Sequence, residues 1–139
     1  MEPLPEANVN SPFLSIIIPT FNERTRIEAT LDKIVNYLRS RSYSWEVKVA
    51  DDGSTDETTA LVTMKAKGDR RISLTQGRHG GKGSALKNGI TQAQGEYIFL
   101  CDADLSMPIH QLERFLPPFL SDYDIVMGSR EVPGARRFK

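Results

Sequence analysis

Five short segments of the chain are rich in aliphatic and β-branched residues, which predicts β-strands. Between them, apolar residues recur at the spacing of amphipathic helices. The predicted strands are Leu14–Ile18, Glu46–Ala50, Ile72–Thr75, Tyr97–Cys101 and Asp124–Gly128. The apolar positions of the predicted helices are Ile27, Leu31, Ile34 and Leu38, then Ala60, Leu61 and Met64, then Ala85, Leu86, Ile90 and Ala93, and finally Ile109, Leu112 and Leu116. Because strand and helix alternate, we expect an α/β fold with a mostly parallel central sheet covered on both faces.

The ends of the second predicted helix carry two familiar signals. Ser54 and Glu57 have the spacing of a capping box, and Gly68 stands where the helix should end. These signals predict a helix that begins shortly after Ser54.

Polar segments follow every predicted strand. They read PTFNE, DDGSTDE, QGRHGGKGS, DADLSMP and SRE in chain order. In open parallel sheets, ligands bind beyond the carboxyl ends of the strands, at the point where the strand order reverses. We therefore expect these polar groups to converge at one edge of the sheet and to form a ligand site there.

Asp102 and Asp104 follow the fourth predicted strand and are two residues apart. In continued strand geometry, both side chains would leave the same face. Two carboxylates held that close repel each other unless a cation lies between them or one is protonated, and Mg²⁺ or Mn²⁺ suits such oxygen ligands. The alternative is a pair of solvated turn aspartates, since Asp is common in turns.

The segments after the second and third strands suggest a nucleotide. Asp51 and Asp52 leave a strand directly, where a carboxylate can accept hydrogen bonds from a nucleobase, although Asp is also a common turn residue. The glycine-rich segment with Lys82 precedes a helix, which suits phosphate binding, although a flexible surface loop fits equally. Because no second His or Cys lies at ligand spacing, His79 is predicted to be a loop residue rather than a metal ligand.

Composition narrows the class of protein. The 139 residues fit one domain, and the formal net charge of zero gives no reason to expect nucleic acid as a partner. We expect residues 1–12 to be a mobile leader and residues 13–139 to form the domain. The apolar runs are too short to cross a bilayer and no signal peptide is evident, so we expect a cytoplasmic protein. Cys101, the single cysteine, lies in an apolar strand and is predicted to act as a small hydrophobe rather than a nucleophile.

Five segments, in this order, carry a resemblance to a known family: SIIIPTFNE, VADDGSTDET, GGKGSALKNGI, DADLSMP and DIVMGSR. They resemble the nucleotide-sugar-dependent glycosyltransferases of family 2, and most of all the branch that makes dolichyl-phosphate glucose and mannose. The resemblance extends from Ser15 to Arg130. It implies the GT-A fold, a Rossmann-like three-layer sandwich, with this chain holding the nucleotide-binding half.

The resemblance also implies roles for single residues at the nucleoside. Pro19, Phe21 and Glu23 would lie against it, with Phe21 standing where the family often has Tyr. Ala50 and Asp52 would contact the base. The full set that the resemblance implies for nucleotide-sugar binding is Pro19, Phe21, Asn22, Glu23, Ala50, Asp52, Lys82, Cys101, Asp102, Ala103 and Asp104.

At the diphosphate, the resemblance implies a metal site with two basic residues. Asp102 and Asp104 would be the D-x-D pair that binds Mg²⁺ or Mn²⁺, with Asp104 the stronger ligand and also catalytic. Lys82 would approach the phosphates. Arg130, counted as catalytic, would face the diphosphate or the acceptor phosphate. Ser106 stands where mannose synthases often carry Gln, which weakens the transfer of that contact.

The expected activity is an inverting transfer of a hexose to a polyprenyl or dolichyl phosphate. The resemblance favours glucose as the sugar, and UDP-glucose over GDP-mannose as the donor. A full-length form could associate peripherally with the cytoplasmic face of a membrane. Because enzymes of this family continue well past the GSR motif, we expect the acceptor part to be missing here, and this chain to bind nucleotide but turn over poorly.

Two other functions are compatible with parts of the sequence. One is a non-catalytic nucleotide-sugar-binding module that lacks an acceptor site. The other is a sugar-1-phosphate nucleotidyltransferase, which would show a glycine-rich basic loop directly after the first strand. The segment PTFNE has no such loop, so this alternative ranks last.

Overall fold

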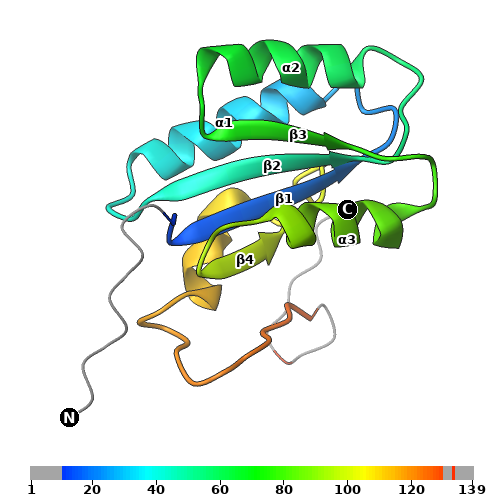
Figure 1. Ribbon diagram of the computed structural model, residues 1–139. Helices are drawn as coiled ribbons and strands as arrows, with labels where there is room; N and C mark the ends of the chain where they lie inside the picture. The colour runs from blue at the N-terminus through cyan, green and yellow to red at the C-terminus, as the bar shows by residue number, and fades with distance from the viewer. Residues whose placement is uncertain (1–10, 130–132, 134–139) are drawn as a thin grey trace. The chain divides into compact units, whose positions relative to one another are not determined.

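The computed structural model describes residues 11–129 and residue 133. The chain divides into two compact units, Met1–Met107 and Pro108–Lys139, which we describe separately. In the first unit, strands and helices alternate as the sequence pattern predicts (Figure 1). Its elements are β1 (Leu14–Thr20), α1 (Ile27–Arg39), β2 (Trp45–Asp51), α2 (Thr58–Gly68), β3 (Ile72–Gln76), α3 (Lys82–Gln92) and β4 (Tyr97–Leu100).

The four strands form one parallel sheet in the order β3-β2-β1-β4. The central strand β1 pairs with β2 on one side and with β4 on the other, so that Ile16 is level with both Val47 and Phe99. Every residue from Leu14 to Ile18 is buried. A strand buried on both faces explains why β1 reads as a nearly continuous apolar run.

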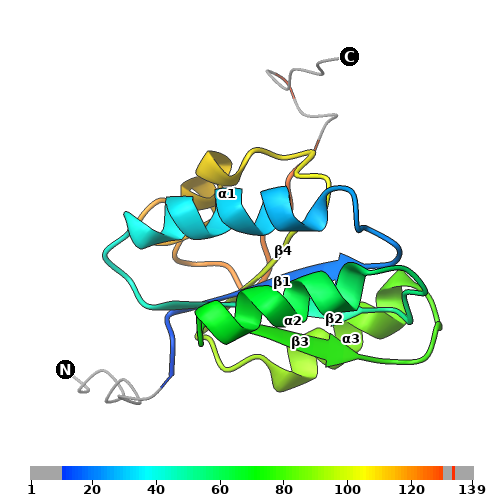
Figure 2. The same cartoon turned by 90° about the horizontal axis from the view of Figure 1, so that it is seen from above.

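The helices cover both faces of the sheet, which gives three layers. Helices α1 and α2 lie on one face and α3 lies on the other (Figures 1 and 2). The chain steps from β1 to β2 to β3 in one direction and then returns to the far side of β1, and right-handed crossovers put the returning helix on the opposite face. The strand order therefore reverses between β1 and β4. The fold is the predicted α/β sandwich with a parallel sheet.

Helix α1 packs on the sheet through the apolar stripe that the sequence predicts. Ile27, Leu31, Ile34 and Leu38 are all fully buried or nearly so. On the opposite face, Ala85 of α3 joins a small apolar cluster with residues of the central strands. Small side chains at this contact let the helix approach the sheet closely.

Helix α2 ends at Gly68 as predicted, but its beginning differs from the prediction. The capping box is absent: Glu57 makes no side-chain bond at the N-cap, and the Ser54 hydroxyl donates to Asp51 instead. Asp56 takes over, because its carboxylate accepts hydrogen bonds from the backbone N–H and the hydroxyl of Thr58. The Ser54 oxygen accepts the backbone N–H of Asn22 at 2.8 Å, so it is directed to the loop after β1 and not to the helix.

The second unit corrects two predictions. Its regular element is a 3-10 helix, η1 (Ile109–Phe115), where the spacing predicts an amphipathic α-helix. The predicted strand Asp124–Gly128 is not formed within the described part of the unit. Ile125 and Met127 are 81% and 84% exposed. An apolar pattern alone does not make a strand, because its backbone groups also need a hydrogen-bonded partner.

Among residues 11–129, no helix has both the length and the apolar character that crossing a membrane requires.

Candidate functional site

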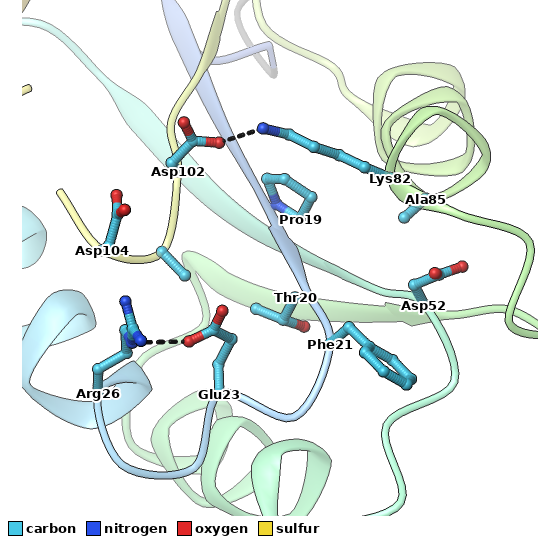
Figure 3. A pocket seen from close by; sticks show the side chains of 11 residues that line it. Pro19, Thr20, Phe21, Glu23, Arg26, Asp52, Lys82, Ala85, Asp102 and Asp104 are labelled. Atoms are coloured by element: carbon cyan, nitrogen blue, oxygen red, sulfur yellow. Dashed lines mark hydrogen bonds and ion pairs between the residues drawn. The ribbon is translucent and has the colours of Figure 1, made fainter. Parts of the chain in front are cut away.

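An open cleft of about 320 Å³ lies in the first unit where β1 and β4 end (Figure 3). This is the reversal point of the strand order, where ligands bind in open parallel sheets. The residues that line the cleft are Pro19, Thr20, Phe21, Glu23, Arg26, Asp52, Lys82, Ala85, Asp102, Ala103 and Asp104. The segments after β1, β2 and β4 and the beginning of α3 thus converge as the sequence predicts.

Asp51 holds the loop after β2 in place and does not line the cleft. Its buried carboxylate accepts hydrogen bonds from the hydroxyls of Thr20 at 2.8 Å and Ser54 at 2.6 Å. It also accepts the backbone N–H groups of Gly53 and Ser54. Since these donors already satisfy the carboxylate, Asp51 fixes the loop after β2, whereas its neighbour Asp52 lines the cleft.

Asn22 joins the loop after β1 to the loop after β2. Its side-chain oxygen accepts the N–H of Thr55 at 2.8 Å, and its own N–H donates to the Ser54 hydroxyl at 2.8 Å. Asn22 has a positive φ of 52°, which Asn tolerates better than most residues. The side chain is therefore used inside the protein, and it does not line the cleft.

The turn that follows β4 presents both carboxylates of the D-x-D pair to the cleft. The Thr30 hydroxyl of α1 donates to the carbonyl of Ala103 at 2.6 Å, which ties the buried middle of the turn to the helix. One oxygen of Asp104 accepts the N–H of Ser106 at 2.9 Å. Leu105 has a φ of 50°, an uncommon value for a residue with a side chain. The turn therefore holds Asp102 and Asp104 in a defined place.

Replacing Thr30 by Val should lower the free energy of unfolding by about 1–3 kcal/mol, because the buried carbonyl of Ala103 loses its hydroxyl donor. Thr63→Val is the matched control, since Thr63 is an exposed helical threonine and its loss should cost less than about 0.5 kcal/mol. Urea denaturation of both variants measures the difference. Equal losses of unfolding free energy in the two variants would show that the hydrogen bond from Thr30 to Ala103 does not stabilise the fold.

Lys82 reaches across the cleft to the acidic pair. It begins α3, and Figure 3 shows its side chain extending past Pro19 toward Asp102. Its ammonium nitrogen lies 2.5 Å from a carboxylate oxygen of Asp102. Both side chains are exposed to solvent, so the ion pair can open when a ligand competes for either partner.

The acidic pair fits a divalent cation that is bound partly through a ligand. Among the described residues, no group of three or more His, Cys, Asp or Glu side chains could hold a metal ion alone. Asp102 and Asp104 nevertheless supply hard oxygen donors to the same cleft. Mg²⁺ and Mn²⁺ are commonly bound by one or two carboxylates, with substrate phosphates and water completing the coordination.

Asp52 is the carboxylate that the loop after β3 encloses. Its side chain is 6% exposed and accepts the N–H of Gly80 at 2.8 Å and the N–H of Gly81 at 3.0 and 3.1 Å. The hydrogen bond from Gly80 lowers the pKa of Asp52 below its usual value, and those from Gly81 and the contact with His79 act in the same direction. Asp52 is therefore ionised at neutral pH.

This lowered pKa predicts an acid-dependent loss of stability. A carboxyl group whose pKa is lower in the folded state stabilises the fold above its unfolded pKa of about 3.9, and that contribution is lost as the pH falls through the folded value. Unfolding free energies measured by urea at pH 5 and pH 3 should therefore fall further in the wild type than in Asp52→Asn. Identical pH slopes for the two proteins would contradict the assignment.

Most of the predicted site residues meet in the cleft, but three of those that the structure describes do not. Asn22 hydrogen-bonds to the loop after β2. Ala50 and Cys101 are buried, and neither lines the cleft. Burial, followed by the nearby charges of Asp102 and Asp104, raises the pKa of the Cys101 thiol to about 12, so it is not a nucleophile at neutral pH. Arg130 lies outside the described residues.

Three residues that line the cleft were missed from the sequence. Thr20 is a small residue next to Pro19, and the sequence predicts Ala85 only as an apolar position of the helix that follows the glycine-rich segment. Arg26 precedes α1 and pairs with Glu23, with 2.8 Å between its Nε and a carboxylate oxygen. The spacing of three residues between Glu23 and Arg26 was the available signal, because it allows such a pair at the beginning of a helix.

Comparison with known proteins agrees with this geometry. Residues 15–139 match the family model for glycosyl transferase family 2. A dolichyl-phosphate beta-glucosyltransferase of Trichomonas vaginalis is 33% identical over an alignment of 151 positions, which covers 94% of this chain and 47% of that protein. A dolichyl-phosphate beta-glucosyltransferase of Mus musculus is 32% identical, with 84% and 40% covered. The chain thus spans less than half the length of these two curated relatives.

Solved structures show the same fold. The mannosyltransferase PcManGT of Pyrobaculum calidifontis, solved with GDP-Man and Mn²⁺, is 29% identical with a TM-score of 0.58, covering 78% of this chain and 34% of that one. Glucosyl-3-phosphoglycerate synthase of Mycobacterium tuberculosis, solved with UDP, has a TM-score of 0.61 at 24% identity, covering 80% and 41%, and shows the likeness of fold alone. The expected GT-A fold is confirmed, and the chain belongs to glycosyl transferase family 2.

Proposed function

We propose that the cleft binds a nucleotide-diphosphate sugar and that the protein transfers the hexose to a polyprenyl phosphate. The observation that carries this proposal is the convergence of two carboxylates and one ammonium group in a single cleft. Asp102, Asp104 and Lys82 surround the place where β1 and β4 end, with Phe21 and Asp52 beside them (Figure 3). A diphosphate needs positive charge, and a nucleobase needs an apolar surface with a polar partner.

The donor would lie along the cleft with its base near β2 and its diphosphate near β4. Phe21 offers an aromatic face and Asp52 a carboxylate for base N–H groups. Lys82 would exchange its contact with Asp102 for the phosphates. Asp102 and Asp104 would hold Mg²⁺ or Mn²⁺, whose charge stabilises the negative charge that develops on the leaving diphosphate.

The acceptor would supply its own nucleophile. A phosphate monoester has a second pKa near about 6 and therefore already carries an oxyanion at neutral pH. Its oxygen would form the new bond to the anomeric carbon while the bond to the nucleoside diphosphate breaks and the electron pair leaves with the diphosphate. Attack from the face opposite the leaving group inverts the anomeric configuration. Such a reaction needs no general base from the protein.

Within this proposal, UDP-glucose is the favoured donor and glucose the transferred sugar. The two curated relatives are named dolichyl-phosphate beta-glucosyltransferases, whereas the mannosyltransferase structure holds GDP-Man. Arg130 is proposed to contact the diphosphate or the acceptor phosphate. Because a polyprenyl phosphate is anchored in a bilayer, the proposal places the reaction at the cytoplasmic face of a membrane.

Two steps test the proposal. UDP and GDP are titrated by calorimetry with and without Mn²⁺, and transfer from UDP-glucose or GDP-mannose to a short-chain polyprenyl phosphate is then followed. We expect Mn²⁺-dependent binding, tighter for UDP. Binding without transfer would favour a nucleotide-sugar-binding module that is not itself catalytic. Absence of binding for both nucleotides would refute the proposed donor site.

A further inference from the structure

The two residues assigned to the nucleobase, Phe21 and Asp52, already contact a side chain of the protein. His79, from the loop between β3 and α3, stacks on Phe21 with 4.3 Å between the ring centres and 24° between the ring planes. Its Nδ1 lies 2.9 Å from a carboxylate oxygen of Asp52 and 3.1 Å from the Asp52 carbonyl. Both neighbours are acceptors, so Nδ1 must carry the proton and donate.

The same loop supplies donors to both oxygens of the Asp52 carboxylate. One oxygen accepts the N–H groups of Gly80 and Gly81, and the other accepts Gly81 and His79. These are three N–H donors for about four lone-pair positions, because the Gly81 N–H is shared between both oxygens and His79 also approaches the Asp52 carbonyl. A nucleobase N–H that bound the oxygen beside His79 would therefore replace the imidazole at that oxygen.

The loop between β3 and α3 packs tightly against the loop after β2, so the fold itself holds His79 near Phe21. Gly53 has a φ of +80°, and a Cβ at this position would lie 2.9 Å from the backbone nitrogen of His79. The N–H of Gly77 donates to the Asp51 carbonyl at 3.1 Å, which anchors the beginning of the loop. In contrast, the His79 side chain is 62% exposed, so its ring can swing outward while the loop backbone stays anchored.

We propose that His79 is an internal competitor of the nucleobase: its imidazole occupies the base position on Phe21 and Asp52 until a nucleotide displaces it. The inference rests on the proposed nucleotide site. A centre-to-centre distance of 4.3 Å leaves no room for a third ring between the two, so a base that stacks on this face of Phe21 replaces His79. Displacing the ring costs the stack and its hydrogen bond, which lowers the apparent nucleotide affinity.

Removing the imidazole should therefore tighten nucleotide binding. We expect His79→Ala to bind UDP in the presence of Mn²⁺ about three- to ten-fold more tightly than the wild type, the range that one aromatic stack accounts for. His79→Phe, which keeps a ring but loses the donor to Asp52, should show a smaller gain. The matched control is His110→Ala, since His110 is the other of the two histidines, belongs to the second unit and lies beside Gln111.

Proton NMR of the imidazole rings gives a second readout that does not depend on affinity. With only two histidines in the chain, the signal that disappears in His79→Ala identifies His79. Without nucleotide, Phe21→Leu should move this signal, because the ring current of Phe21 is lost. Saturating UDP and Mg²⁺, which unlike Mn²⁺ does not broaden nearby proton signals, should shift it in the same direction in the wild type.

The outcomes separate this inference from the proposed function. Tighter binding by His79→Ala together with a nucleotide-dependent shift of the His79 signal supports the competitor. Weaker or unchanged affinity overturns it and leaves the donor site intact, and so does a His79 signal that stays fixed when nucleotide binds. If UDP binds neither to the wild type nor to His79→Ala, the proposed donor site is refuted, and so is the proposal that His79 competes with the nucleobase.

Discussion

Replacing Asp104 by Asn should weaken the Mn²⁺-dependent binding of UDP by about ten- to a hundred-fold, which corresponds to the loss of one charge-assisted contact. Asp104 faces the cleft and its carboxylate is positioned by the N–H of Ser106. An amide of the same shape keeps that hydrogen bond but removes the negative charge that a divalent cation needs. Binding measured without Mn²⁺ should change little, because the nucleoside contacts remain.

The control for this variant is Asp32→Asn on helix α1. Asp32 pairs with Lys65 at 2.6 Å and does not line the cleft, so its neutralisation removes one charge from the protein without touching the site. Calorimetric titration of both variants, with and without Mn²⁺, gives the comparison. If Asp104→Asn and Asp32→Asn have the same small effect, Asp104 is a solvated turn residue, as the sequence alone also allows.

Replacing Gly89 by Val should lower the free energy of unfolding by about 3 kcal/mol, the upper part of the range for overpacked cores. A Cβ at Gly89 would lie 2.7 Å from Ile17 Cγ2 and 3.1 Å from the Ala50 Cβ. Both neighbours are buried in central strands and cannot move aside without distorting the sheet. Because α3 also carries Lys82, the displaced helix should weaken nucleotide binding as well.

Gly83→Val in the same helix is the matched control. A Cβ at Gly83 would meet no atom within 4 Å, so this variant should change the free energy of unfolding by less than about 0.5 kcal/mol. Urea denaturation of the two proteins measures the effect of the helix-to-sheet distance alone. Similar stabilities for both variants would mean that α3 does not pack on the sheet as closely as described.

The strands and helices of the first unit could be predicted because burial imposes a period on the sequence. Each of its predicted strands lies within two residues of the observed one at both ends, and the stripe on α1 is the buried face. The segments after the strands converge because all four strands are parallel. Fold class and the place of the cleft therefore follow from local patterns.

The features that could not be predicted from the sequence depend on contacts between distant segments of the chain. Asn22 reads as one more polar residue in a loop, but its oxygen is consumed by the loop after β2. The stack of His79 on Phe21 joins loops that are far apart in the chain, so the spacing of residues in the sequence could not predict it. The segment Asp124–Gly128 has the composition of a strand, and only a partner strand could have made it one.

The proposed function requires above all that a divalent cation and a nucleotide share the cleft at the end of β4. A crystal structure of the chain with Mn²⁺ and UDP tests this directly. We predict the cation on Asp102 and Asp104, the diphosphate beside Lys82, and the uracil on Phe21 with the His79 ring moved outward. Nucleotide bound elsewhere, or a cleft in which Asp102 still holds Lys82 and no cation is present, would contradict the account.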